Sequence, residues 1–294
     1  MLRYALPNSI RQKLIHFGYH SRPSFLIIGA QRAGTTALYY YLATHPDIVP
    51  GRDKEIGFFT PETFTGLPDH PHHSRLCRGS TSIFSDPPAY AAAADWYHAL
   101  FPLPHSLGHH RITFEATPEY LYFPFAPERI FNYHPRMKLI ALLRDPVERA
   151  FSAWNMYHNF DDPIYSRIRE TRSFEQATTD ELNQIEVDVS TIGPDYVRRG
   201  LYADQLRRYL KFFPPDQLLW IDSRRLHGET SAVLDEVALF LGLRPFSSGR
   251  TWTPMHVGRY EHGPPPESVR FLRDFYKPHN QELYELLNHD FGWP

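Results

Sequence analysis

A short apolar run that ends in a glycine, with a polar loop and a second apolar segment after it, constrains the fold more than any other feature. Residues 25–28 read Phe-Leu-Ile-Ile and Gly29 follows them, while residues 37–42 form the next apolar-rich segment after Thr35 and Thr36. Four consecutive apolar residues are typical of a buried strand, and threonine suits the N-terminus of a helix. The pattern therefore predicts the order strand, loop, helix.

The same alternation recurs along the chain. Buried-strand patterns lie at 112–114, 139–143 and 218–221, and a segment of helical character follows each of them. Such alternation is typical of a parallel sheet with covering helices. The predicted fold class is α/β, of the three-layer P-loop type, with a central parallel sheet flanked by helices. The clearest helical patterns cover residues 89–100, 147–157, 201–212, 232–241 and 268–287.

The composition favours one large domain behind a short basic segment. A chain of 294 residues with 42% hydrophobic side chains can fill a sizeable core. We expect a single domain over residues 23–294. The N-terminal basic segment, residues 1–22, mixes basic with apolar side chains, which suits either a helix packed on the domain or an amphipathic segment on an anionic membrane surface. Loops are expected at 70–85, 161–194 and 247–266.

Charge and cysteine content limit the partners and the compartment. Lys and Arg number 31 against 33 Asp and Glu, so binding of nucleic acid is not expected and any anion site must be local. A single cysteine, Cys77, fits a reducing compartment. No run approaches the roughly 20 apolar residues of a transmembrane helix. The sequence predicts a soluble, cytoplasmic protein. Peripheral contact with the inner membrane face through residues 1–22 stays open.

Residues 29–36, Gly-Ala-Gln-Arg-Ala-Gly-Thr-Thr, stand where a phosphate-binding loop would join strand and helix. Backbone N–H groups and the helix dipole favour an anion there. In loops that bind ATP or GTP a lysine follows the second glycine. Here Thr35 holds that place, the cation is Arg32, and the later strand leads into Arg144 before Asp145. A P-loop kinase or nucleotide hydrolase is therefore the weaker alternative, and a turn that only caps a helix also stays open.

Residues 138–152, Lys-Leu-Ile-Ala-Leu-Leu-Arg-Asp-Pro-Val-Glu-Arg-Ala-Phe-Ser, supply a second signature. With the first loop, this segment resembles sulfotransferases of the heparan sulfate type, which use 3′-phosphoadenosine 5′-phosphosulfate (PAPS). The resemblance continues through residues 95–97, 115–120, 201–202, 211–214 and 291–294. It implies transfer of a sulfuryl group from PAPS to a hydroxyl or amino group of a carbohydrate-type acceptor by in-line displacement, with no obligatory metal.

The resemblance assigns the cofactor-binding residues. The first loop is expected to bind the 5′-phosphosulfate through Arg32, Ala33, Gly34, Thr35 and Thr36. Arg144 and Ser152 match the residues that bind the 3′-phosphate, and a planar guanidinium suits bidentate phosphate recognition. Tyr202 is a further candidate for contact with the cofactor. Gly258 and Arg259 match a cofactor loop in which Val257 replaces the family's lysine.

The resemblance also assigns the chemistry. Glu55, within Lys-Glu-Ile-Gly-Phe-Phe, matches the catalytic glutamate and is expected to be the general base, the alternative being a solvated carboxylate paired with Lys54 or Arg52. Arg32 matches a loop lysine, which implies leaving-group stabilisation, as general acid or only as an electrostatic clamp. Lys54 is expected to assist. Three roles remain open for Glu115: it binds the acceptor, it orients a basic neighbour, or it is purely structural.

The chain departs from the heparan sulfate 3-O-sulfotransferases in ways that leave the acceptor open. Ala116 stands where they carry a lysine, and their loop-closing cysteine pair and membrane anchor are missing, which implies a soluble relative of bacterial type. Saccharide, glycolipid, polyketide and small alcohol acceptors remain, in that order. A non-catalytic nucleotide- or glycan-binding relative is a further alternative. The pairs His72-His73 and His109-His110 lack a zinc-binding pattern, and no metal site is predicted.

Overall fold

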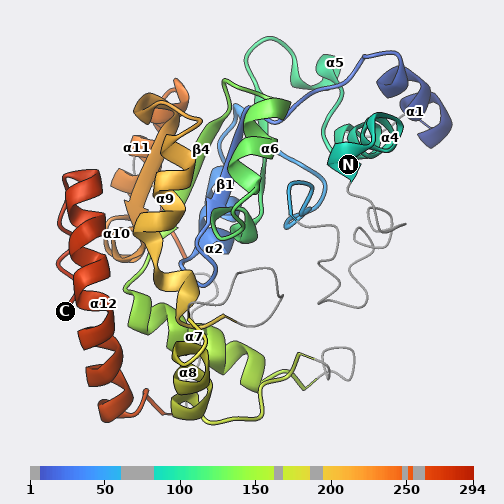
Figure 1. Cartoon of the computed structure of the whole chain (residues 1–294). Coiled ribbons are helices and arrows are strands. Elements are labelled where there is room, and N and C mark those ends of the chain that lie inside the picture. The colour runs from blue at the N-terminus through green and yellow to red at the C-terminus, as the bar shows by residue number, and fades with distance from the viewer. Residues whose placement is uncertain (1–6, 61–82, 162–167, 186–194, 247–250, 254–261) are drawn as a thin grey trace.

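A computed structural model describes residues 7–60, 83–161, 168–185, 195–246, 251–253 and 262–294 (Figure 1). Five parallel strands form one sheet in the order β2-β3-β1-β4-β5. Their bounds are β1 Phe25–Gly29, β2 Ile48–Pro50, β3 Ile112–Ala116, β4 Lys138–Leu143 and β5 Leu218–Asp222. All five residues of the central strand β1 are buried, as expected for a strand covered on both faces.

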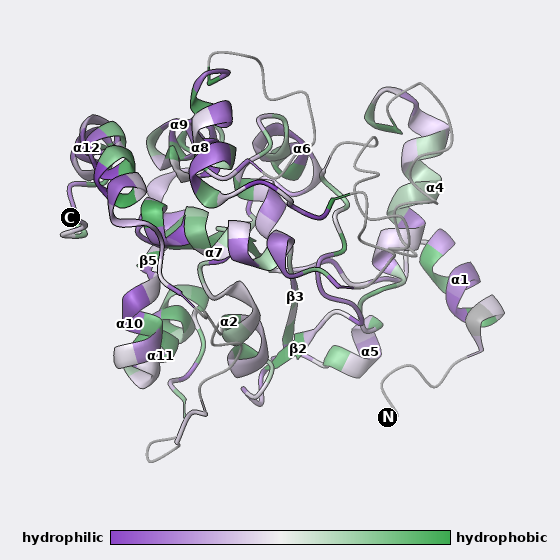
Figure 2. Cartoon of the chain, turned by 90° about the horizontal axis from the view of Figure 1, so that it is seen from below, coloured by the Kyte–Doolittle hydropathy of each residue, from purple (hydrophilic) through white to green (hydrophobic). Residues whose placement is uncertain are grey.

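Helices cover both faces of this sheet, which confirms the three-layer α/β prediction. Figure 2 shows α2, α10 and α11 on one side of the strands and α6, α9 and α12 on the other. Their bounds are α2 Thr35–Leu42, α6 Ala126–Tyr133, α9 Tyr202–Leu210, α10 Ser223–Gly228, α11 Thr230–Leu241 and α12 Pro266–Leu287. The remaining short elements are α5 Pro104–Leu107, η2 Ile83–Ser85, η3 Pro118–Leu121, η5 Arg198–Gly200 and η6 Pro215–Gln217.

Helix α7, Pro146–His158, begins directly after β4 and lies below the sheet in Figure 1. The Asp145 side chain accepts hydrogen bonds from the backbone N–H groups of Val147 and Glu148, at 2.8 and 2.9 Å. Pro146 fills the first helical position, where its missing N–H costs nothing. Because Asp145 caps the helix, the start of α7 is fixed at the carboxyl end of β4, where ligands of open α/β sheets bind.

One of the three expected loops contains a helix. Helix α8, Phe174–Leu182, lies inside the segment 161–194, which we expected to lack regular structure. Ser173 and Gln176 form a capping box at its start, and this local signal was present in the sequence. Most of the expected loop 70–85 and part of 247–266 fall outside the described residues. Strand β2 and helix α6 were not predicted. The strand has three residues and the helix eight, which leaves little periodicity to detect in the sequence.

The N-terminal helix α1, Asn8–His16, packs on α4, Pro87–His98. Its Ile15 is buried, and the Arg11 guanidinium donates hydrogen bonds to the carbonyl oxygens of Ala99 and Phe101. For residues 8–16 the structure thus shows a helix packed on the domain, although Phe17 is 85% exposed just beyond it. The boundary at residue 22 stays a prediction. In the described part of the chain, no helix has the length and apolar character needed to cross a membrane.

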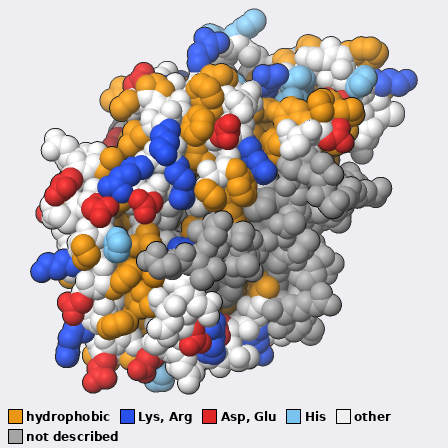
Figure 3. Space-filling view, in the orientation of Figure 1, with side chains coloured by type: hydrophobic (Ala, Val, Ile, Leu, Met, Phe, Trp, Pro, Cys, Tyr) orange, Lys and Arg blue, Asp and Glu red, His pale blue; other side chains and the backbone are white. Residues whose placement is uncertain are grey.

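The described surface has no large area of one charge on the face drawn in Figure 3, where basic and acidic side chains are intermingled. This distribution agrees with the net charge of −2. An anion site on this protein must therefore be built locally, from a few side chains and backbone groups.

Candidate active site

The loop after β1 turns into α2 at Gly34, which adopts φ +97° and stands at the N-cap of the helix. This left-handed conformation is one that glycine adopts without steric cost. A Cβ at Gly34 would also lie 3.3 Å from Cδ2 of Leu226. Thr35 and Thr36 fill the first turn of α2, where backbone N–H groups lack partners within the helix. Loop and helix N-terminus thus have the form of an anion-binding site.

Arg32, Arg144 and Ser152, which come from three different elements, lie together beside this loop. Nε of Arg32 donates to Oγ of Ser152 at 3.1 Å, and Nη1 of Arg144 donates to the carbonyl oxygen of Arg32, also at 3.1 Å. Nε of Arg144 lies 3.2 Å from Oε2 of Glu148, which is the ion pair expected for a surface arginine. Two guanidinium groups and the N-terminus of α2 make this a site for anions, and they fit a ligand with two phosphate groups.

Several other predicted cofactor residues occupy places that limit their role. Tyr202 is only 1% exposed, and its hydroxyl donates to the carbonyl oxygen of Arg144 at 3.0 Å. The structure therefore makes it a support for Arg144 and does not place it at an open surface, in contrast to the expected contact with the cofactor. Ala33 and Thr35 are buried, and the Ala33 N–H already donates to the carbonyl oxygen of Ala30 at 3.1 Å, so of these two residues Thr35 is the one whose backbone N–H is available to a ligand. Gly258 and Arg259 lie outside the described residues.

Glu55 is fixed through its backbone and exposed through its side chain. Its N–H donates to the carbonyl oxygen of Ala116 at 2.9 Å, and its carboxylate pairs with Nζ of Lys54 while 46% of the side chain remains exposed. Both Glu55 and Arg32 have positive φ, at 60° and 69°. Such backbone conformations are costly for residues other than glycine and cluster at active sites. In the described residues only Asn288, at the end of α12, is a further non-glycine example.

The carboxylate of Glu115 points into the core, away from any acceptor. The residue is 0% exposed, and three hydroxyl groups donate to it: Tyr97 at 3.0 Å, Tyr120 at 2.7 Å and Thr117 at 2.7 Å. Burial raises the pKa of Glu115, and the three hydrogen bonds act against that rise. Of the roles left open by the sequence, this geometry supports the structural one and contradicts direct acceptor binding.

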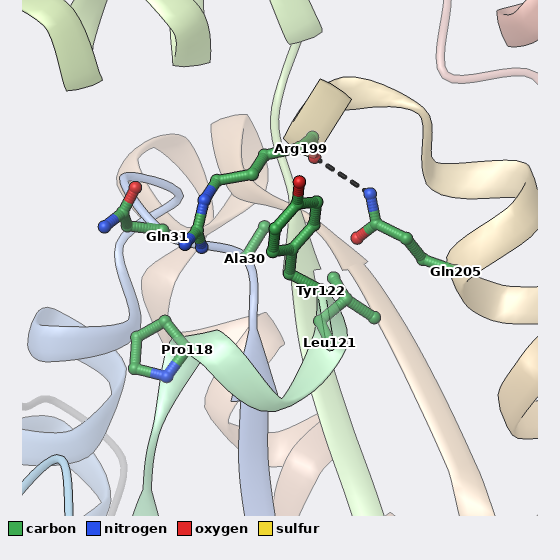
Figure 4. Close-up of a pocket in the computed structure, with 7 residues that line it drawn as sticks. All are labelled: Ala30, Gln31, Pro118, Leu121, Tyr122, Arg199 and Gln205. Carbon is green, nitrogen blue, oxygen red and sulfur yellow. Dashed lines mark hydrogen bonds between the residues drawn. The ribbon is translucent and has the colours of Figure 1, made fainter. Parts of the chain in front are cut away.

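A small pocket next to the loop contains residues that the sequence did not single out. It is lined by Ala30, Gln31, Pro118, Leu121, Tyr122, Arg199 and Gln205 (Figure 4). Nε2 of Gln31 lies 3.4 Å from Oε1 of Glu119 and 3.3 Å from the hydroxyl of Tyr157, and Nη1 of Arg199 lies 4.0 Å from the same oxygen of Glu119. Arg199 and Glu119 are distant in sequence, so no local pattern could pair them.

Electrostatics connect this pocket to Glu55. Burial raises the pKa of Glu119, the negative charge of Glu55 raises it further, and Arg199 and Lys54 lower it. Gln31, which lines the pocket, directly precedes Arg32 in the loop. No group of three or more metal-ligating side chains occurs among the residues that the structure describes.

This fold and this cluster of cations define a P-loop-type α/β protein with a candidate site for an anion. A model described as "Sulfotransferase family" matches residues 23–247, and the chain belongs to that family. The bifunctional heparan sulfate N-deacetylase/N-sulfotransferase 4 of Mus musculus is 30% identical over 92% of this chain, and the match covers 30% of that protein. The heparan sulfate glucosamine 3-O-sulfotransferase 3A1 of Mus musculus is 29% identical over 95% of this chain and 66% of its own length.

Among solved structures, a sulfotransferase from Alicyclobacillus acidocaldarius superposes with a TM-score of 0.68 at 28% identity. The superposition covers 92% of this chain and 98% of that one. The chain therefore covers 98% of one solved sulfotransferase but about 30% of the length of the N-deacetylase/N-sulfotransferases that it matches. The family expected from the loop and from residues 138–152 is confirmed.

Proposed function

We propose that this protein transfers a sulfuryl group from PAPS to a hydroxyl or amino group of a carbohydrate acceptor. The observation that carries the proposal is the cluster of Arg32, Arg144 and Ser152 at the loop after β1. Two separate cations suit a nucleotide with two phosphate positions better than a linear triphosphate. Relatives named as heparan sulfate N- and 3-O-sulfotransferases support a carbohydrate acceptor and leave both O- and N-sulfation open.

The chain's own residues supply three functions in this reaction. PAPS, when bound, supplies the sulfuryl group and leaves as the 3′,5′-bisphosphate. Arg144 and Ser152 hold the 3′-phosphate, while Arg32 and the N–H groups at the start of α2 neutralise the charge that develops on the 5′-phosphate side. Glu55 takes the proton of the acceptor group as that group attacks the sulfur. Lys54, paired with Glu55, keeps its carboxylate in place.

Ligand selectivity tests the cofactor. Thermal unfolding is measured with 3′-phosphoadenosine 5′-phosphate (PAP), with ADP and with Mg-ATP, since a ligand at 100 times its Kd stabilises the native state by about 2.7 kcal/mol. We expect a selective shift with PAP that is lost in Arg144→Ala. Arg207→Ala is the matched control, because Arg207 pairs with Asp204 and Glu282 on the exposed side of α9. Preference for Mg-ATP would instead support a P-loop kinase or hydrolase.

Glu55→Gln separates an enzyme from a binding protein. The variant keeps the size of the side chain and removes the proton acceptor, so we expect sulfuryl transfer to fall by about 10²–10⁴-fold while PAP still raises the unfolding temperature. The assay follows labelled sulfate from PAPS into a panel of saccharide and glycolipid acceptors. If no acceptor is modified and Glu55→Gln behaves as the wild type, the chain is a non-catalytic relative.

We further propose a cytoplasmic location with peripheral membrane contact through the N-terminal basic segment. Ile10 and Phe17 are 49% and 85% exposed beside the basic side chain of Lys13, which suits binding to anionic lipid. Sedimentation with vesicles containing phosphatidylserine should deplete the wild type more than Phe17→Ser. Equal recovery of both proteins in the supernatant would remove the membrane part of the proposal.

A further inference from the structure

Histidine side chains connect the N-terminal basic segment to the rest of the domain. Helix α1 lies beside α4 (Figure 1), and Nδ1 of His16 on α1 lies 3.0 Å from Oδ2 of Asp95 on α4. Beyond α1, the rings of His20 and His98 stack, with centroids 3.8 Å apart and an interplanar angle of 7°. These two rings, called the histidine pair below, join the segment to the last residue of α4.

The surroundings of the histidine pair suit neutral imidazoles. His98 is buried, and its Nε2 lies 2.9 Å from the hydroxyl of Tyr133 on α6. Nδ1 of His98 and Nδ1 of His20 are also buried, and neither atom has a hydrogen-bond partner among the described residues. A protonated imidazole needs an acceptor for both of its N–H groups, and a buried charge without one is costly. The stack therefore disfavours the protonated form of either ring.

The charged groups around the histidine pair act mostly in the same direction. Burial, then the neighbouring His20 and Arg22, lowers the pKa of His98 to about 3. Burial and Arg22 also lower the pKa of His20, while a backbone hydrogen bond and the carboxylate of Asp95 raise it. Tyr133 stays neutral in acid, since burial raises its pKa. The docked segment thus holds both rings in the form that acid removes.

The sign of the pH effect follows from these directions. The pKa of docked His98 lies below the ordinary value of 6.5, so its stabilisation of docking is complete above that value and is lost as the pH falls toward 3. One such histidine weakens docking about tenfold between pH 7.5 and pH 5.5. The pair of His16 with Asp95 strengthens when His16 is protonated, but 73% of that side chain is exposed, and surface ion pairs contribute little.

We propose that the histidine pair is a pH-sensitive contact, which holds residues 7–22 on α4 at neutral pH and releases them in mildly acidic solution. Release uncovers the buried Ile15 next to Ile10 and Phe17, which are already exposed. The segment then offers more apolar surface to an anionic membrane. This consequence rests on the membrane contact proposed above, whereas the pH-sensitive contact itself does not.

Hydrogen–deuterium exchange of the purified full chain measures docking. Helix α1 has nine residues, and a helix of that length is marginal without packing, so its amides exchange when the segment is released. Protection of α1, corrected for the intrinsic exchange rate, is compared at pH 7.5 and pH 5.5. We expect it to fall at least about tenfold. Helix α12, on the opposite side of the molecule (Figure 1), is the internal reference and should keep its protection.

Two variants assign the pH effect to the histidine pair. His20→Phe keeps an aromatic ring on His98 and removes one group that takes up a proton. His98→Gln removes the other group and keeps a polar side chain beside Tyr133. Each variant should make the fall in α1 protection at least about threefold smaller than in the wild type. His16→Gln is the matched control, because its contact lies on the surface, and it should keep the wild-type pH effect.

The outcomes separate the contact from the membrane. Equal protection of α1 at the two pH values overturns the pH-sensitive contact, and so does a wild-type pH effect in both His20→Phe and His98→Gln. Sedimentation with phosphatidylserine vesicles is run at the same two pH values. More wild-type protein in the pellet at pH 5.5 than at pH 7.5, with a smaller difference for His20→Phe, supports both proposals. Full recovery in the supernatant together with loss of α1 protection supports the contact and removes the membrane proposal.

Discussion

Replacing Glu115 by glutamine tests whether this carboxylate is structural. The native side chain accepts hydrogen bonds from Tyr97 and Tyr120 on one oxygen and from Thr117 on the other, with no exposed surface. An amide has one oxygen to offer, so at least one buried hydroxyl loses its acceptor. That loss costs about 1–3 kcal/mol. At about 2–4 °C per kcal/mol, the melting temperature of Glu115→Gln should fall by roughly 2–12 °C.

Urea denaturation followed by tryptophan fluorescence measures the free energy of unfolding, and differential scanning calorimetry measures Tm. The control is Glu55→Gln, whose side chain is 46% exposed and should change stability by no more than about 0.5 kcal/mol. Well below its Tm, Glu115→Gln should keep the wild-type KM for the acceptor. If Glu115→Gln has the stability of the wild type and a raised KM for the acceptor, Glu115 is not structural and belongs to the acceptor site instead.

Three further predictions concern pH, the loop cation and the loop glycine. Burial raises the pKa of Glu115, so the folded protein keeps this proton to a higher pH than the unfolded chain. The stabilisation from this proton is complete below 4.5, the ordinary pKa of the group, and is lost as the pH rises through the pKa of the folded state. In urea titrations the destabilisation by Glu115→Gln should therefore be smaller at pH 8 than at pH 4.5. An equal or larger loss of stability at pH 8 contradicts this prediction. In the sulfate-transfer assay Arg32→Ala should lower kcat by about 10²–10³-fold, and Arg32→Lys should lower it by much less. If both variants have the kcat of the wild type, Arg32 does not stabilise the leaving group. Gly34→Ala should lower the free energy of unfolding by at least about 1 kcal/mol, because φ is +97° and the new Cβ lies 3.3 Å from Leu226. Calorimetric titration should also show weaker binding of PAP. Unchanged affinity for PAP would mean that the loop adapts to the new side chain.

The sequence was sufficient for the elements whose signals are local. The runs at 25–28, 139–143 and 218–221 are strands because four or five consecutive apolar residues suit burial on both faces. Helix α8 was missed because its polar surface weakens the 3.6-residue period, and only its capping box identifies it. The loop cation was likewise found from a local motif, the Arg144–Ser152 pair was found from the family resemblance of residues 138–152, and the structure brings these residues together.

Side-chain direction and distant pairing were beyond the sequence. Glu115 was considered for acceptor binding from its residue type, yet it lies within the buried part of β3 and faces Tyr97 and Tyr120. Arg199 and Glu119 meet because the tertiary fold brings η5 beside η3. A sequence pattern gives the chemistry of a residue, whereas the partner that decides its role depends on the tertiary fold.

The left-handed backbone at Arg32 and Glu55 has a consequence for engineering. Each conformation destabilises the folded state by about 1–3 kcal/mol for a residue with a side chain, and glycine would remove that strain. Glycine also makes the unfolded chain more flexible, which destabilises the folded state by about 0.5–1 kcal/mol. The balance favours glycine more at Glu55, whose side chain is 46% exposed, than at Arg32, where glycine also removes the hydrogen bond to Ser152. A library of variants selected only for heat resistance should therefore enrich Glu55→Gly. Such a selection would yield stable proteins that lack the proposed general base.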